Sequence, residues 1–218
     1  MATPFAEARE AYERYDYDTA FRLLKPLAEQ GSAEAQFMLA VMHEDGGGVP
    51  QDSVEAAKWY RKAADQGHAS AQYNLGIMYA LGSGVPQSHG EAAKWYRKAA
   101  DQGHASAQLN LGSMHFLGQG IPKDYAEAAK WFSKAAEQGN AKAQYNLVSL
   151  YKNGQGVPKS LVMALMWAIL AASRIPASEK MGQEKIRMLR EEIASGMTPA
   201  LIEEAQTLAR DWKPKKQN

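Results

Sequence analysis

The sequence predicts an all-α fold: a right-handed α-α superhelical solenoid of about five helix pairs, with capping helices at both ends. Two observations predict it, a residue pattern that recurs every 36 residues and, inside each repeat, apolar residues at the spacing of an α-helix. The segment EAAKWYRKAADQGHASAQ occurs at residues 55–72 and again at residues 91–108. Chance does not produce this recurrence, which also places tryptophan and glutamine at fixed offsets: Trp59, Trp95, Trp131 and Trp167, and Gln36, Gln72, Gln108 and Gln144.

The repeat at residues 69–103 shows why each repeat is predicted to be two helices. Its first helix places four residues on one face at helical spacing: Ala71, Leu75, Met78 and Tyr79. Gly82 and Gly84 then end that helix, and Pro86 prevents its continuation. The second helix runs through SHGEAAKWYRKAADQ. One such pair cannot bury its own apolar face, so neighbouring repeats must stack on one another.

The start of each second helix has its own signature, a capping residue followed by glutamate three positions later. The pairs are Asp52 with Glu55, Ser88 with Glu91 and Asp124 with Glu127. Ser88 with Glu91 predicts a capping box, in which each side chain accepts a hydrogen bond from the other residue's backbone N–H. The two aspartate pairs approximate the same motif. Recurring glutamates can resemble catalytic carboxylates, but this spacing is what a helix start requires.

The ends of the chain depart from the repeat, which predicts three regions. Residues 1–15 form an N-terminal capping helix, residues 16–175 form the repeats, and residues 176–218 form C-terminal capping helices and a basic tail. In the last repeat, Ile175-Pro176 replaces the Gln-Gly ending. Thr198 suits an N-cap and Pro199 the first position of the last helix. Atypical ends are expected because a solenoid must cover its terminal apolar faces.

These residues together resemble the Sel-one-like repeat, a relative of the tetratricopeptide repeat. The shared pattern is A-x-x-N-L-G-x-M-Y-x-x-G-x-G-V-P followed by D-x-x-E-A-A-K-W-Y-x-K-A-A-x-Q-G, found here from Ala71 to Pro86 and from Ser88 to Gly103. The resemblance covers about residues 16–172 and, more weakly, both ends. It implies a solenoid whose first helices line a concave groove and whose second helices line the convex side. It also implies a partner protein, since such proteins often act in bacterial signalling, secretion or envelope functions.

The outward positions of the first helices form a predicted partner-binding surface on that concave side. The equivalent residues Phe37, Tyr73, Leu109 and Tyr145 predict an apolar and aromatic row, with acidic residues at one end and lysines at the other. Such a groove suits an extended or helical peptide, with aromatic anchors supplying affinity and end charges setting orientation. The predicted residues are Glu34, Phe37, Val41, Glu44, Tyr73, Ile77, Leu109, Phe116, Lys142, Tyr145 and Lys152.

Two features of this surface have a structural alternative. The aromatic row could pack between neighbouring first helices instead of meeting a partner, because this helix position is often half-buried in such folds. The repeated Asn74, Asn110 and Asn146 could hydrogen-bond a ligand's backbone or carboxylate. For the asparagines we favour the structural interpretation, in which they satisfy neighbouring backbone groups.

Composition and motifs argue against several other classes of protein. The chain of 218 residues has no cysteine, which excludes thiol nucleophiles, disulfides and thiolate metal sites. Net charge is +1, so no global field points to nucleic acid or a membrane surface, and no apolar run is long enough to span a membrane. No His-Glu-x-x-His or Gly-x-Ser-x-Gly motif occurs. We therefore expect no enzyme activity, no catalytic residue, no metal and no cofactor.

The resulting hypothesis is a monomeric scaffold or adaptor that binds a protein or peptide segment in its groove. The alternative is an envelope-associated protein that binds or hydrolyses glycans, since a row of tyrosines also stacks on sugars. The N-terminus Met-Ala-Thr-Pro-Phe has neither the basic nor the apolar region of a signal peptide. We expect a periplasmic or secreted protein if a signal peptide has been removed ahead of residue 1, and a cytoplasmic protein otherwise.

Overall fold

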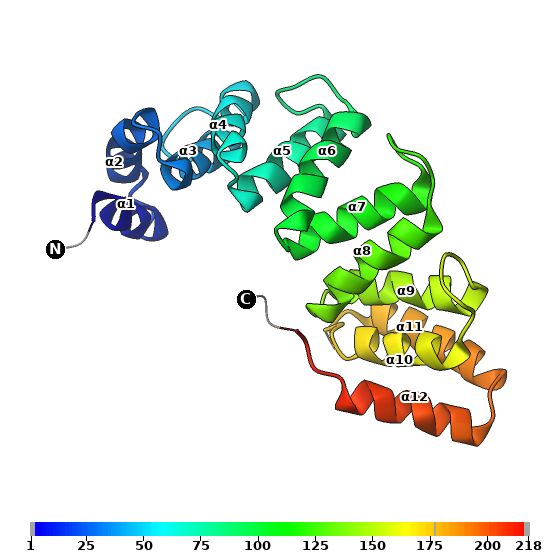
Figure 1. The fold of residues 1–218 in the computed structure, drawn as a ribbon. Helices are drawn as coiled ribbons and strands as arrows, with labels where there is room; N and C mark the ends of the chain where they lie inside the picture. Colours follow the sequence, from blue (N-terminus) through cyan, green and yellow to red (C-terminus); the bar gives the residue numbers. More distant parts are fainter. Residues whose placement is uncertain (1–2, 177, 216–218) are drawn as a thin grey trace. The chain divides into compact units, whose positions relative to one another are not determined.

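The computed structural model describes residues 3–176 and 178–215, and within those ranges it contains α-helices and no strand. Lys216 of the predicted basic tail lies outside the described residues. The chain divides into two compact units, Met1–His104 and Ala105–Asn218. Unit 1 holds α1 (Pro4–Glu13), α2 (Tyr17–Glu29), α3 (Ala33–Asp45), α4 (Ser53–Asp65), α5 (Ala69–Leu81) and α6 (His89–Asp101) (Figure 1). Unit 2 holds α7 (Ala105–Leu117), α8 (Tyr125–Glu137), α9 (Ala141–Asn153), α10 (Leu161–Ala172), α11 (Lys180–Ser195) and α12 (Pro199–Asp211). The predicted all-α repeat solenoid is confirmed.

The two helices of a repeat pack through a small residue on the first and a ring on the second. Adding a Cβ to Gly76 in α5 would place it 2.6 Å from the Tyr96 ring in α6. Adding one to Gly112 in α7 would place it 2.7 Å from the Phe132 ring in α8. The absence of a side chain at the glycine therefore makes the space that the buried ring fills. In the next repeat the larger residue lies on the first helix and the smaller one on the second: buried Val148 in α9 and buried Ala168 in α10.

A buried glutamine joins a first helix to the second helices on both sides of it. Gln72 in α5 donates through Nε2 to the Ala64 carbonyl of α4 at 3.0 Å, and its Oε1 accepts from Gln102, after α6, at 2.7 Å. The equivalent Gln36 makes the same two bonds, to the Ala28 carbonyl and from Gln66. This explains why glutamine recurs at a buried position: both ends of the amide are satisfied by neighbouring helices. We call this arrangement the glutamine bridge.

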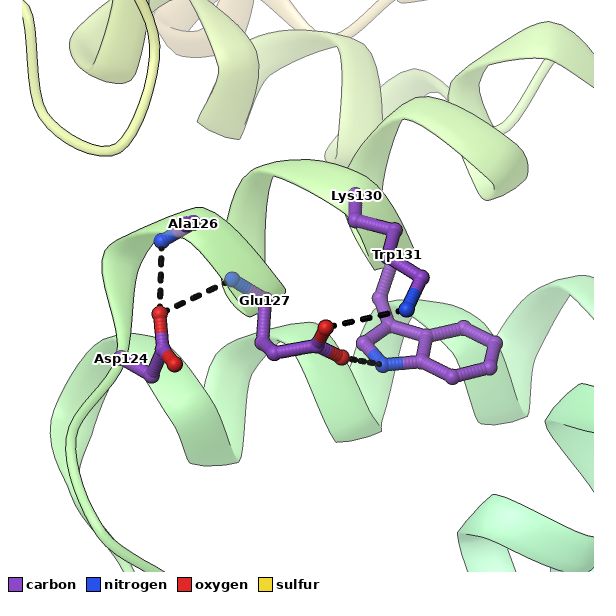
Figure 2. Close-up of polar contacts among 5 residues, drawn as sticks. All are labelled: Asp124, Ala126, Glu127, Lys130 and Trp131. Carbon is purple, nitrogen blue, oxygen red and sulfur yellow. Dashed lines mark hydrogen bonds and ion pairs between the residues drawn. The ribbon is translucent and has the colours of Figure 1, made fainter.

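The start of each second helix is capped as predicted, but the reciprocal half of the capping box is absent. Asp124 Oδ1 accepts from the backbone N–H groups of Ala126 and Glu127 at 2.9 and 3.0 Å (Figure 2). The Asp124 N–H, however, donates to the His115 carbonyl of α7, and the Ser88 N–H donates to the Tyr79 carbonyl of α5. The capping-box prediction is therefore wrong at Ser88 with Glu91, because the loop gives the cap N–H a partner in the preceding helix.

The recurring glutamates instead hold side chains of their own helix. Glu127 accepts from Lys130 Nζ at 2.9 Å and from the Trp131 indole N–H at 3.1 Å (Figure 2). Glu55 and Glu91 pair in the same way with Lys58 and Lys94, three residues on. Pairs at this spacing lie on one face of a helix, so the repeated glutamates are accounted for by helix structure.

The end of unit 2 departs from the repeat because α10 has three helical neighbours. Helix α9 precedes it, and both α11 and α12 pack against it (Figure 1). Seven of its twelve residues are accordingly buried, among them Trp167 and Met166. Thr198 caps α12 by accepting from the Leu201 N–H at 3.4 Å, and Pro199 is its first residue. Both closing helices and the Thr198 cap are as predicted from the sequence.

Candidate partner-binding site

A pocket of about 570 Å³ opens in unit 2 where α7, α9 and the segment after α10 meet. We call it the Tyr145 pocket. Its volume is within the range of about 300–1,000 Å³ that is usual for ligand-binding clefts. Apolar, amide and charged side chains all contribute to its wall: Leu109, Asn110, Ser113, Ala141, Lys142, Tyr145, Asn146, Ala171, Arg174, Ile175, Pro176 and Glu179. Three of the predicted partner-binding residues, Leu109, Lys142 and Tyr145, therefore come together here.

Tyr145 is the most accessible aromatic position of the predicted row, with 47% of its surface exposed. It also lines a second cavity of about 180 Å³, which lies between α9 and α11 and includes Val148 and Leu189. The Tyr145 ring thus stands between two hollows. Tyrosine is enriched among the residues that anchor protein interfaces, and such anchors are commonly seated in pockets.

The pocket wall holds two cations, Lys142 and Arg174. Among the described residues no carboxylate lies within ion-pair distance of either one. The Arg174 guanidinium carbon lies 5.2 Å from the centroid of the Trp212 ring. On its other side, a Cβ added to Gly139 would lie 3.3 Å from the guanidinium, so this glycine leaves room for it. Arg174 is held in place by these neighbours, and its charge is not neutralised by them.

Arg174 interrupts the glutamine bridge. By the 36-residue period it takes the place of Gln66, Gln102 and Gln138, each of which donates to the buried glutamine of its repeat. Gln144 still donates to the Ala136 carbonyl at 3.2 Å, but its fully buried Oε1 has no donor. The period also corrects the alignment of the last repeat, because Arg174-Ile175, and not Ile175-Pro176, stands where the other repeats have Gln-Gly.

Asn146 supplies an amide that the fold does not use. In unit 1 the equivalent Asn74 donates through Nδ2 to the Tyr60 hydroxyl at 2.9 Å. The residue equivalent to Tyr60 beside Asn146 is Phe132, which has no hydroxyl. Asn146 has no side-chain hydrogen bond to any described residue, although it is partly buried and lines the pocket. The structural role predicted for the asparagines therefore fits Asn74, where the partner is a side chain and not the backbone, but no such bond is formed at Asn146.

The equivalent aromatic residues of unit 1 are covered by histidines. The Phe37 ring stacks on His68 with centroids 4.6 Å apart, and the Tyr73 ring stacks on His104 at the same separation. Burial lowers the pKa of both histidines, which favours neutral rings at neutral pH. Thirty-one residues after Tyr145 the chain has Pro176 in place of a histidine. This substitution accounts for the exposure of Tyr145.

The remaining predicted residues lie on the outward positions of the first helices, and several of them are engaged inside the chain. Glu44 accepts from the Tyr60 hydroxyl at 2.5 Å, and Lys152 pairs with Glu192 of α11 at 2.5 Å. Phe116 packs edge-on against Tyr125 with centroids 5.3 Å apart. Val41 and Ile77 are partly buried in unit 1, and Glu34 is exposed.

The recurring carboxylates are poor candidates for acid catalysis. The hydrogen bond from Lys130 holds the pKa of Glu127 below its usual range, and the backbone N–H of Glu127 does the same for Asp124. A general acid at neutral pH requires a raised carboxyl pKa. Within the described residues no group of three or more histidine, aspartate or glutamate side chains is placed to hold a metal ion. No described helix has the length and apolar character needed to cross a lipid bilayer.

Sequence reasoning missed Arg174 and underestimated Asn146 as pocket residues. Both were visible as departures from the repeat: arginine where the other repeats have glutamine, and phenylalanine where Asn74 has a tyrosine hydroxyl. The signal lay in comparing the last repeat with the others position by position.

Tandem helix pairs that recur every 36 residues define an α-helical repeat protein of the tetratricopeptide-like class. The sequence model of the Sel1 repeat matches residues 11–32, 33–68, 69–104, 105–140 and 141–174. The chain therefore belongs to the Sel1 repeat family, the Sel-one-like repeat that the sequence resembles. Sel1 repeat proteins generally serve as protein-interaction scaffolds and are generally non-catalytic.

Solved structures of similar proteins carry the same repeats. A Sel1 repeat protein from Oxalobacter formigenes is 31% identical with a TM-score of 0.76, over 90% of this chain and 86% of that one. A protective antigen of uropathogenic Escherichia coli strains, which displays an SLR fold, is 29% identical with a TM-score of 0.59. That match covers 96% of this chain but 52% of the antigen, so this chain spans about half of the antigen's length. Comparison with curated proteins gives no match.

Proposed function

We propose that this chain is a protein-interaction scaffold that binds a short peptide segment of a partner in the Tyr145 pocket of unit 2. The observation that carries the proposal is the exposure of Tyr145, 47%, between hollows of about 570 and 180 Å³. Aromatic side chains with hollows beside them are typical anchors of protein interfaces, because a partner side chain can bury the ring on both faces.

The composition of the pocket supports a peptide as the ligand. Leu109 and Ile175 offer apolar surface to a side chain, while the Asn146 amide and the Ser113 hydroxyl oxygen offer hydrogen-bonding groups to a backbone. Peptide backbones present N–H and C=O groups that must keep hydrogen bonds when they leave water. A pocket that combines both kinds of surface meets the two needs. The role of Sel1 repeat proteins as interaction scaffolds points the same way.

The same surface in unit 1 supports the proposal by contrast. Phe37 and Tyr73 are stacked on histidines of their own unit, so their apolar area is already partly covered. Less area is left there for a partner to bury, and burial of apolar area is the main source of affinity at such anchors. We therefore place the principal site in unit 2. No observation favours the envelope-associated alternative, in which the chain binds or hydrolyses glycans.

Selection from a displayed library of random short peptides on the full chain tests the proposal. The selected peptide is then titrated against the wild type, Tyr145→Ala and Leu117→Ala. We expect Tyr145→Ala to weaken binding at least tenfold. Leu117, 64% exposed in α7 and outside the pocket, is the matched control and should bind as the wild type does. Peptide binding that is unaffected by Tyr145→Ala would show that the site lies elsewhere.

A further inference from the structure

We propose that a groove along α11 binds an acidic amphipathic helix of a partner protein, with a carboxylate of that helix paired to Arg190. The inference goes beyond the proposed function, because it assigns a second interaction surface to unit 2. This surface shares no lining residue with the Tyr145 pocket. A scaffold with both surfaces can hold two partners at once.

The groove consists of two adjoining hollows, of about 220 and 360 Å³, because Arg187 and Arg190 line both of them. The lining residues of α11 extend from Lys180 at one end to Ala194 at the other, which corresponds to about 21 Å along the helix axis. We call this the α11 groove. It is about four helical turns long, so a short helix can lie along it with its side chains in the hollows.

The fold leaves this flank of α11 without a helical neighbour. In the preceding repeats the first helix packs closely on the second helix that follows it: α3 on α4, α5 on α6, α7 on α8 and α9 on α10. Helices α11 and α12 instead each pack on α10 and make little contact with one another. The hollow between them has apolar walls from Leu165 and Ile169 of α10 and Ile202 of α12. The position that a second helix occupies in the other repeats is therefore open, and an amphipathic helix fits such a groove.

The charges of the α11 groove favour an acidic partner. Arg187 is already paired, with Glu184 at 2.6 Å and with Glu191 at 2.7 Å. Arg190 has no ion-pair or hydrogen-bonding partner among the described residues, although its Nε atom is buried. Removing a cation from water without a partner is destabilising, and arginine can make two parallel hydrogen bonds to one carboxylate. A partner carboxylate at Arg190 would remove this deficit.

The remaining wall residues specify what surrounds that carboxylate. Leu165 and Ile169 lie beside Arg190 in the same hollow and offer apolar surface to a neighbouring side chain of the partner. Glu184 and Glu191 also line the groove, and they repel a ligand that carries many negative charges. An amphipathic helix with one acidic residue between apolar residues, one turn apart, meets both conditions. A polyanion such as a nucleic acid does not.

Selection from a displayed library of helical peptides, randomised on one face, tests the inference on the full-length chain. The selected helices are titrated against the wild type and three variants. Arg190→Gln removes the unpaired cation, and Ala194→Phe fills the groove; each should weaken binding at least tenfold. Lys185→Gln removes the same charge from an exposed position of α11 outside the groove and should bind as the wild type does. The thermal unfolding midpoint of Arg190→Gln should stay equal or rise, which separates a binding role from a structural one.

A change in the peptide tests the ion pair itself. Replacing the glutamate or aspartate of a selected helix by its amide should weaken binding to the wild type at least tenfold but change binding to Arg190→Gln little. The inference is overturned if every selected helix binds folded Arg190→Gln and Ala194→Phe as tightly as the wild type. Dimers of the wild type in light scattering that disappear in Ala194→Phe would also overturn it, because the occupant would then be a second copy of this chain.

Discussion

The two units of this protein share one repeat sequence but differ in the internal contacts that its outward side chains make. In unit 1 the outward aromatic residues of the first helices stack on histidines, the Asn74 amide bonds Tyr60, and each buried glutamine has both of its partners. At the end of unit 2 each of these contacts is missing: Pro176 replaces the histidine, Phe132 the tyrosine and Arg174 the glutamine. The three replacements fall around one pocket. Loss of internal partners at equivalent positions thus coincides with the pocket where we propose that the partner binds.

The largest expected effect concerns the packing of helix pairs, which is similar in both units. Phe132→Ala removes a buried ring and should lower the free energy of unfolding by about 3–5 kcal/mol. Gly112→Val alone should also lower the free energy of unfolding, by about 1–3 kcal/mol, because the valine side chain would clash with the Phe132 ring. The double variant should lose less stability than Phe132→Ala, because it reproduces the Val148 and Ala168 pair of the next repeat. Urea unfolding of all three proteins measures this, and additive losses would refute the size complementarity.

The second comparison sets Tyr73 against Tyr145. Tyr73→Ala removes stacking on His104 and contact with Tyr96, so it should cost about 1–3 kcal/mol of stability with little change in peptide binding. Tyr145→Ala should change stability by no more than about 0.5 kcal/mol, because its ring is exposed, yet abolish most peptide binding. Calorimetric melting together with peptide titration separates the two. The same pattern of effects in both variants would mean that the units do not differ as described.

The third comparison concerns the glutamine bridge. It predicts that Gln102→Ala lowers the free energy of unfolding and that Arg174→Gln raises it. Gln102→Ala leaves the buried Gln72 oxygen without its donor and should destabilise by about 1–3 kcal/mol. Arg174→Gln gives the Gln144 oxygen a donor and should stabilise by about 1 kcal/mol. Destabilisation by Arg174→Gln in thermal unfolding would show that the arginine serves the fold.

The smallest expected effect is a pH dependence of stability that arises at His68 in unit 1. Burial lowers the pKa of His68, and its Nδ1 accepts from the Ala71 N–H at 3.2 Å as the N-cap of α5. A lowered histidine pKa means that the unfolded chain binds the proton more readily. The neutral His68 side chain therefore contributes fully to the free energy of unfolding above about pH 6.5. This contribution is lost as the pH falls toward and through the pKa of His68 in the folded protein. His68→Asn should flatten this decline, since Asn140 caps α9 in the same way at 3.0 Å. A slope of stability between about pH 5 and 7 that is the same in both proteins would contradict it.

Most of the fold could be predicted from the sequence because its signals are periodic. The 36-residue spacing of tryptophans and the glycine loops determine where each helix begins and ends, and Thr198-Pro199 marks the start of α12. The capping box could not be predicted correctly, because the Ser88 N–H finds its partner at Tyr79, a contact made only when the loop is folded. The sequence pattern alone does not contain that competition.

The candidate site was predictable only in part. Leu109, Lys142 and Tyr145 were expected on the outward positions of the first helices, and they line one pocket. The pairing of Lys152 with Glu192 and of Glu44 with Tyr60 could not be foreseen, because these partners are distant in the sequence and pattern does not reveal them. The exposure of Tyr145 depends on Pro176, which stands where Tyr73 has His104. The stacking of Tyr73 on His104 is a contact made only in the folded chain, so its loss at Tyr145 could not be foreseen from the pattern.

The central claim is that the open surface of unit 2, and not its covered counterpart in unit 1, is where the partner binds. Titration of the selected peptide into isotopically labelled full-length protein, followed by amide and side-chain NMR shifts, tests it most directly. We predict that the largest shifts lie at residues 109–113, 141–146 and 171–179. Largest shifts around Phe37 and Tyr73, with those of the Tyr145 pocket unmoved, would contradict it.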